Sequence, residues 1–158
     1  PAKWHHSYLK DFYRDNRLVQ PGGLTVDGTP IDLGQVRTPA YIQAGIEDHI
    51  APPCSVWKLM DHFAGSRRFL LAGSGHIAGV VNPPAAKKYQ YWTSDTPQPD
   101  FAAFREVAKE TKGSWWPDWI DWLTAMTPEQ VDADGARIPG GGAYGAIEDA
   151  PGRYVRMR

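Results

Sequence analysis

Two residues suited to acid–base chemistry, Asp48 and His76, each follow a short apolar run that ends in glycine. Asp48 lies in "IEDHIAPP" behind "RTPAYIQAG", and His76 lies in "SGHIAGV" behind "RRFLLAG". A carboxylate can orient an imidazole so that the ring acts as a base. Glycines around His76 let its loop turn tightly and leave the ring uncovered. The residue types therefore predict an acid–histidine pair, provided that the fold brings the two loops together.

The segments around this pair predict the elements that position it. Both apolar runs, residues 37–45 and 67–73, are typical of buried strands of a parallel sheet, and Ser55–Phe63 fits a helix between them. One crossover helix accounts for the 28 residues that separate Asp48 from His76, so the two strands are expected to be parallel neighbours. Functional groups collect at the carboxyl ends of such strands. The alternative is a surface aspartate and a loop histidine that never meet.

Other segments carry patterns of their own. Residues 4–18 have aromatic side chains at helical spacing and are followed by "QPGGL", which predicts an amphipathic helix. "LTVDGTPIDL" has Asp27 and Gly28 between short apolar runs, the pattern of a tight hairpin. In "GSWWPDWIDWL", Ser114 can cap a helix whose tryptophans are expected to pack the segment onto the domain. The glycine- and proline-rich residues 132–158 are expected to form a loop, with "RYVRM" as the only strand-like piece.

The composition indicates an ordinary globular domain. Of 158 residues, 42% are hydrophobic and 22% are charged, which allows one domain with a core. The 17 basic and 18 acidic side chains give a net charge of -1, which argues against nucleic acid or an anionic membrane as partner. No apolar run reaches the roughly 20 residues of a membrane span and no secretory signal is recognisable, so a soluble intracellular protein is expected. Because the chain starts at Pro1 inside a helical pattern, it is expected to be a piece of a longer chain.

The nucleophile that an acid–histidine pair would serve is not recognisable. An acid followed by a histidine in strand-end loops is the closing half of the nucleophile, acid, histidine order of α/β-hydrolases, but the sequence has no G-x-S-x-G stretch or cysteine counterpart. Cys54 is the only thiol, it follows two prolines, and a structural or incidental role is expected for it. One cysteine allows no intrachain disulfide, and the 5 histidines lack the spacing of a metal site. The nucleophile is therefore expected upstream.

Four stretches carry a resemblance to a known family: "EDHIAPP", "GSGHIAGVVNPP", "GSWWPDWIDWL" and the terminal "APGRYVRMR". Together they resemble the C-terminal part of the catalytic domain of a polyhydroxyalkanoate (poly(3-hydroxybutyrate)) synthase of the single-subunit class I type. The resemblance implies an α/β fold class: the C-terminal segment of an α/β-hydrolase fold, with a mainly parallel sheet flanked by helices, incomplete on its own. It divides the chain into the end of a cap region or a helix leading into the core (1–24), core strands and loops with the acid and the histidine (25–92), and a Trp-rich helical and C-terminal tail (93–158).

The same resemblance implies an acyltransferase. Such an enzyme polymerises 3-hydroxyacyl-coenzyme A, here 3-hydroxybutyryl-coenzyme A, with release of coenzyme A, through a cysteine upstream of this chain. Asp48 is then the acid of the triad and His76 its base, and either of them could activate the 3-hydroxyl of a hydroxyacyl unit. His49 is expected to support the acid, and Asn16, on one helix face with Tyr8 and Phe12, to border a substrate route. Coenzyme A is a substrate, and no cofactor or metal is expected.

The expected partners also follow from the resemblance. They are the upstream part of the same synthase, a second copy in a homodimer and the surface of polyester granules in the cytoplasm; neither nucleic acid nor a transmembrane segment is expected. Two other functions stay open: an esterase or depolymerase of the same fold with an upstream serine, and a structural or interaction module without catalysis. A G-x-C-x-G elbow upstream supports the synthase, a serine elbow the hydrolase, and no elbow the module.

Overall fold

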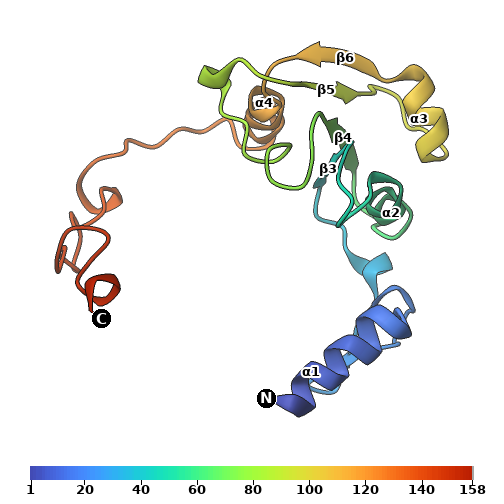
Figure 1. Cartoon of the computed structure of the whole chain (residues 1–158), viewed down its shortest axis with the longest axis horizontal. Coiled ribbons are helices and arrows are strands. Elements are labelled where there is room, and N and C mark those ends of the chain that lie inside the picture. The colour runs from blue at the N-terminus through green and yellow to red at the C-terminus, as the bar shows by residue number, and fades with distance from the viewer. Residues whose placement is uncertain (158) are drawn as a thin grey trace. The chain divides into compact units, whose positions relative to one another are not determined.

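Four strands form one sheet in the computed structural model, which describes residues 1–157 (Figure 1). They lie side by side in chain order: β3 (Ala40–Gly45), β4 (Arg67–Ala72), β5 (Gln90–Thr93) and β6 (Lys109–Lys112). β3 and β4 are parallel, whereas β4 with β5 and β5 with β6 pair antiparallel. The expectation of a mainly parallel sheet is therefore wrong for these residues. The reason is the connection after β4, which returns through a loop and lacks the α-helical crossover that usually joins parallel neighbours.

Helices cover both faces of this sheet and place the chain in the mixed α/β class (Figure 1). α2 (Pro53–Trp57), continued by a 3-10 turn at Lys58–Asp61, and α3 (Phe101–Val107) share one hydrophobic cluster with the strands: Ile42, Ala44, Trp57, Phe69, Leu71 and Phe104. Trp115, the residue before α4 (Trp116–Met126), packs together with Tyr41 against a second cluster, formed by Leu70, Ala72 and Tyr91. Neighbouring residues of β4 join different clusters because successive strand side chains point to opposite faces.

The helix expected in the Trp-rich segment is confirmed as α4. The Ser114 hydroxyl accepts a hydrogen bond from the amide of Trp116 at 3.1 Å, as expected of a cap. Pro117 and Asp118 lie in the first turn, where proline needs no amide hydrogen and an acidic group suits the helix dipole. The sequence signal for the beginning of this helix was therefore sound.

The N-terminal helix is present but shorter than expected. α1 (Ala2–Tyr8) continues in a wider π-helical segment, Leu9–Arg14, and stops at Asp15 rather than at residue 18. Asn16 has a left-handed φ of 44°, which a continuing right-handed helix cannot contain. The next turn, Arg17–Val19, is a separate 3-10 turn for that reason.

The hairpin prediction is confirmed. β1 (Thr25–Val26) and β2 (Thr29–Pro30) pair antiparallel around a two-residue turn. Asp27 and Gly28 both have positive φ, 47° and 76°, as a type I′ turn requires. Aspartate tolerates positive φ better than most residues and glycine adopts it freely, so these two residues favour a type I′ turn.

The chain divides into two compact units, Pro1–Asp121 and Trp122–Arg158. In the described part of the second unit, the end of α4 is followed by 3-10 turns at Gly135–Arg137 and Tyr154–Arg156. The expected strand-like character of "RYVRM" is wrong, because no strand among residues 1–157 pairs with it and it closes into a turn instead. No helix in residues 1–157 is both long and apolar enough to cross a membrane. The division at residues 24 and 92 stays a prediction.

A partly buried ion pair attaches the start of α4 to the strands of the sheet. Arg68 of β4 donates to both carboxylate oxygens of Asp118, at 3.0 and 2.6 Å, and the hydroxyl of Tyr41 of β3 donates to the same group at 2.7 Å. Burial opposes ionisation of Asp118, but the hydrogen bonds from Arg68 and Tyr41 outweigh it and hold the pKa of this carboxyl below its usual value. One carboxylate thus joins α4 to both strands through charge-assisted hydrogen bonds.

We expect Asp118→Asn to lower the free energy of unfolding by about 2 kcal/mol near neutral pH, because an amide cannot replace the charged partner of Arg68. The folded-state pKa of Asp118 is lowered, so this contribution is present above the unfolded value of about 3.9 and is lost as pH falls through the lower folded value. Urea unfolding at about pH 7 and about pH 2 measures both effects.

The matched control is Asp121→Asn, an exposed carboxylate on the same helix. It should change the free energy of unfolding by less than about 0.5 kcal/mol at either pH. An equal loss in the two variants, or a loss for Asp118→Asn that persists undiminished in acid, would contradict the role given to the ion pair.

Candidate active site

The hydrogen bonds of the parallel pair continue past the strand ends into the two loops that follow. Gly45 of β3 stands beside Ala72 of β4 in the register. The amide of Ile46 then donates to the carbonyl of Ala72 at 2.8 Å, and the amide of Glu47 donates to the carbonyl of Ser74 at 3.1 Å. The loop after β3 and the loop after β4 are therefore bonded to each other immediately before the acid and the histidine.

The structure brings Asp48 and His76 together. Oδ2 of Asp48 lies 2.8 Å from Nδ1 of His76, and Oδ1 accepts hydrogen bonds from the amides of Ile50 and Ala51, both at 2.9 Å. The bond from Ala51 contributes most to holding the pKa of Asp48 below its usual value; the bonds from His76 and Ile50 add to it, and burial opposes them. Asp48 is therefore an ionised acceptor with both oxygens engaged.

His76 keeps one ring nitrogen for chemistry. When Nδ1–H donates to the carboxylate, the lone pair of the neutral ring is on Nε2. No protein group within residues 1–157 hydrogen-bonds Nε2, and 48% of the side chain is exposed, against 8% for Asp48. This tautomer is the one in which a histidine accepts a proton from a neighbouring nucleophile.

A cavity of about 430 Å³ lies beside the pair. Asp48 and His76 line it together with aliphatic side chains from their loops and from α2, namely Ala51, Val56, Ile77, Val80 and Val81. Apolar walls around an exposed imidazole suit an acyl group better than a highly charged one. The arrangement can therefore support proton transfer next to an apolar reactant.

Unused hydrogen-bonding groups flank this cavity on the side of β3. Nε2 of Gln43, which lines the cavity, is buried and has no hydrogen-bond partner within the described residues. Leaving such a group unpaired costs about 1–3 kcal/mol. β3 is also the outermost strand of the sheet in residues 1–157, although Ile42 and Ala44 in it are buried.

The remaining predicted residues do not reach the pair. Cys54 is exposed in the first turn of α2 and does not line the cavity. His49 is exposed and has no hydrogen bond within residues 1–157, and Asn16 is exposed at the end of the N-terminal helix, outside the cavity lining. The supporting roles expected for His49 and Asn16 stay predictions. In the part of the chain that the structure describes, no three His, Cys, Asp or Glu side chains lie together as a metal site.

Two residues that contact the histidine loop were not predicted from the sequence. The indole Nε1–H of Trp115 donates to the carbonyl of Gly79 at 2.9 Å, and that of Trp116 donates to the carbonyl of Val80 at 3.0 Å. The helical spacing of the tryptophans indicated only that they pack against the domain. Trp115 does pack in this way, with its ring centroid 6.0 Å from that of Tyr41. The signal that could have found them is the indole N–H, which needs an acceptor when its ring is partly buried.

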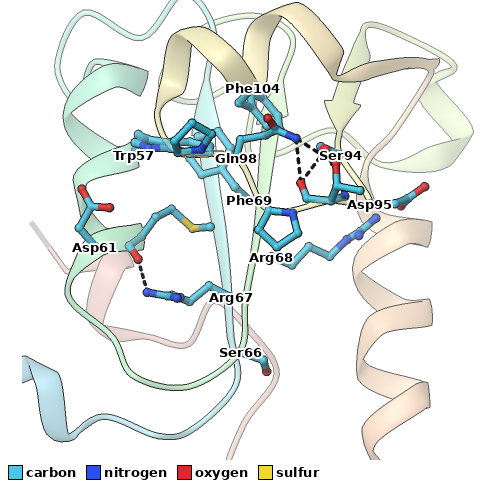
Figure 2. A pocket seen from close by; sticks show the side chains of 14 residues that line it. Trp57, Asp61, Ser66, Arg67, Arg68, Phe69, Ser94, Asp95, Gln98 and Phe104 are labelled. Atoms are coloured by element: carbon cyan, nitrogen blue, oxygen red, sulfur yellow. Dashed lines mark hydrogen bonds between the residues drawn. The ribbon is translucent and has the colours of Figure 1, made fainter.

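A larger cavity of about 690 Å³ lies at the opposite end of β4, around Arg67 and Phe69 (Figure 2). Two of its polar side chains bond within the protein: Arg67 donates to the main-chain oxygen of Met60, and Gln98 donates to the hydroxyl of Thr96 at 2.9 Å. The acid and the histidine follow the other ends of their strands and do not line this cavity. The candidate site is therefore the smaller cavity.

The fold and the site define a mixed α/β protein with an acid–histidine pair at the ends of two adjacent parallel strands. No family model matches the chain. It is 48% identical over 158 residues to the poly(3-hydroxyalkanoate) polymerase subunit PhaC of Rhizobium meliloti and 42% identical over 158 residues to that of Cupriavidus necator. It is 43% identical over 159 residues to the poly(3-hydroxyalkanoate) polymerase of Methylorubrum extorquens. These matches cover 100% of this chain and 25 or 26% of each relative.

The chain belongs to the poly(3-hydroxyalkanoate) polymerase family. It spans about a quarter of the length of the curated relatives it matches. This chain thus corresponds to one part of each relative.

We expect Asp48→Asn to switch the tautomer of His76. A carboxamide has one oxygen, which cannot serve both the two backbone amides and Nδ1 of the ring. With that oxygen kept on the amides, the NH₂ group faces Nδ1, and the ring proton moves to Nε2. Nitrogen-15 NMR of the imidazole, at a pH where the ring is neutral, distinguishes the two forms.

Asp61→Asn is the control for this change, since Asp61 is an exposed carboxylate in the 3-10 turn after α2. It should leave the proton of His76 on Nδ1. Finding an Nδ1–H ring in Asp48→Asn as well would show that the carboxylate does not set the tautomer.

Proposed function

We propose that this chain supplies the acid and the histidine of a polyhydroxyalkanoate synthase, which polymerises 3-hydroxyacyl-coenzyme A with release of coenzyme A. Asp48 orients His76, and His76 is the base for a cysteine carried by another part of the whole protein. The observation that carries the proposal is the 2.8 Å contact between Nδ1 of His76 and the buried carboxylate, in a chain 48% identical to a poly(3-hydroxyalkanoate) polymerase subunit. The parallel pair β3–β4, with α2 on one face and α4 on the other, is then part of an α/β-hydrolase fold.

The first step moves an acyl group from coenzyme A to the cysteine. The thiol gives its proton to Nε2 of His76, the thiolate attacks the thioester carbonyl, and coenzyme A leaves with that proton. One thioester replaces another, so the acyl group stays activated. Asp48 stabilises the imidazolium because its carboxylate remains ionised: its pKa is lowered, chiefly by the bond from the Ala51 amide.

The second step forms the ester bond. The 3-hydroxyl of one unit attacks the acyl–cysteine thioester, a base takes the hydroxyl proton, and the cysteine thiolate is released. We assign this proton to His76 rather than Asp48, because Oδ1 of Asp48 already accepts from two amides and Oδ2 from the ring. General-base help of this kind accelerates such a reaction by about 10²- to 10⁴-fold.

The cysteine and a further strand come from the rest of the whole protein in this proposal. Three features of β3 support it: the outer edge has no pair in residues 1–157, Ile42 and Ala44 are nevertheless buried, and the amide nitrogen of Gln43 has no partner there. A strand laid along this edge takes up the free main-chain groups and brings an acceptor within reach of Gln43. A match to about a quarter of each polymerase relative leaves ample chain for such a strand.

Exchanging this chain for the matching quarter of the Rhizobium meliloti polymerase subunit tests the proposal. We expect the exchanged enzyme to form polymer from 3-hydroxybutyryl-coenzyme A, because the two segments are 48% identical. His76→Ala in the exchanged enzyme should lower the rate by at least about 100-fold, because it removes the base while the loop imidazole contributes little to packing. Release of coenzyme A gives the rate, and the mass of the polymer gives the product.

His6→Ala is the matched control, since His6 is an exposed histidine of α1. It should keep the rate within about twofold of the parent. A folded exchanged enzyme that makes no polymer, or one in which His76→Ala turns over as fast as His6→Ala, would falsify the proposed function.

By itself the chain should transfer no acyl group from coenzyme A. Its only thiol, Cys54, is exposed and does not line the cavity of the acid and the histidine, so within residues 1–157 no thiol lies beside the proposed base. Incubation with labelled 3-hydroxybutyryl-coenzyme A, followed by detection of protein-bound label, measures this. Stoichiometric labelling that disappears in Cys54→Ser would identify Cys54 as the nucleophile and overturn the mechanism above.

A further inference from the structure

The loop that carries His76 is anchored on both sides of the histidine. Before it, the carbonyl of Ser74 accepts from the amide of Glu47 in the acid loop at 3.1 Å. After it, the carbonyls of Gly79 and Val80 accept from two consecutive tryptophans, at 2.9 and 3.0 Å. The histidine thus lies between a bond to the loop of its acid and a pair of bonds to the Trp-rich segment.

Apart from the buried Asn82, whose amide donates to the carbonyl of Lys88 at 3.1 Å, the side chains of the loop do little to fix it. Ile77 and Val81 are 74% and 62% exposed, and the ring of His76 is half exposed. The amide of Val81 donates to the carbonyl of Ile77 at 2.8 Å, which closes a turn inside the loop but joins it to nothing else. The carbonyl of Val80 also accepts from the amide of Asn82 at 3.2 Å, inside the loop, whereas the two indole bonds join Gly79 and Val80 to the Trp-rich segment.

The tryptophans are themselves held by the strands that end at the site. The ring of Trp115 stacks on that of Tyr41 at 6.0 Å, and the hydroxyl of Tyr41 donates to Asp118 at 2.7 Å. Arg68 pairs with the same carboxylate. β3 and β4 therefore hold the Trp-rich segment at the start of α4 in place. Through its two tryptophans, this segment in turn holds the loop that follows β4.

We propose that Trp115 and Trp116 are positioning residues that keep Nδ1 of His76 on the carboxylate of Asp48 through their bonds to the loop. This inference rests on the proposed function of His76 as the base. Neither indole lines the cavity, so neither touches a reactant there, and the effect on the reaction runs through the histidine. Losing the two bonds frees the loop after His76 and lowers the fraction of molecules in which the ring is oriented.

Phenylalanine keeps an aromatic ring and removes the N–H, so Trp115→Phe and Trp116→Phe test the bonds separately. In the exchanged enzyme we expect each to lower kcat about tenfold, with KM within about twofold, because orientation of the base and not binding is lost. In the 158-residue chain we expect the Nδ1–H proton signal of His76 to broaden through faster exchange with water. Trp116 belongs to neither buried cluster, so if Trp115→Phe fails to fold, Trp116→Phe still tests whether the indole bonds position His76.

Trp119→Phe is the matched control, one helical turn after Trp115. Its ring is 39% exposed and lies 6.1 Å from that of Trp115, and its indole has no hydrogen bond within residues 1–157. It should change neither kcat nor the signal. The proposal is overturned if kcat of the folded variants stays within twofold of an active parent, if their Nδ1–H signal is unchanged, or if Trp119→Phe has the same effects. If the unmodified exchanged enzyme makes no polymer, the proposed function fails and the Nδ1–H signal alone decides whether the tryptophans position the ring.

Discussion

The parallel pairing of β3 with β4, in one register, is the constraint on which the site depends. Gly45 beside Ala72 puts the ends of the two strands level, so that the next hydrogen bonds join the loops themselves. A slip by one residue would turn every side chain of a strand to the opposite face and displace its end by about 3.3 Å. A contact of 2.8 Å between the acid and the histidine does not survive such a displacement.

Different forces hold this register on the two faces of the sheet. On one face, the rings of Trp57, Phe69 and Phe104 pack against one another, with centroids 4.7 to 5.3 Å apart. On the other face, Arg68 and Tyr41, opposite each other in the register, share the carboxylate of Asp118. Burial of Phe69 and Leu71 on the first face disfavours a slip by one residue, and the shared carboxylate on the second face requires Arg68 and Tyr41 to be level.

The sequence was informative where structure is set by local spacing. Two apolar runs joined by one helix-length connection predicted the parallel pair, and with it the meeting of Asp48 and His76. It was uninformative for β5, α3 and β6, which have no counterpart among the expected elements. β5 and β6 are four residues each, and all residues of β6 are exposed, so no alternation of apolar and polar side chains marks them. The direction of β5 depends on its pairing with β4, and the local sequence pattern gives no information about that pairing.

In the candidate site, too, some residues could be predicted from the sequence and others could not. Asp48 and His76 stand in glycine- and proline-rich loops whose composition marks them, and both could be chosen from the sequence. The contacts of Trp115 and Trp116 join residues 36 positions apart, and the tryptophan spacing is equally typical of a packed helix. The unpaired amide of Gln43 is likewise a property of its surroundings, since a glutamine in a strand is ordinarily satisfied.

Gly79 is a position of the histidine loop at which the main chain leaves no room for a side chain. A Cβ on Gly79 would lie 2.7 Å from the carbonyl oxygen of Gly75 and 3.1 Å from that of Gly73, so any other residue there must push the backbone apart. Ile77 and Val81 line the same cavity yet are largely open to solvent, so their size is not fixed by packing. Substitutions at 77 and 81 can therefore reshape the cavity wall while His76 stays where it is. Under the proposed function, the residues that shape the cavity and the residue that serves as the base therefore occupy separate positions of one short loop.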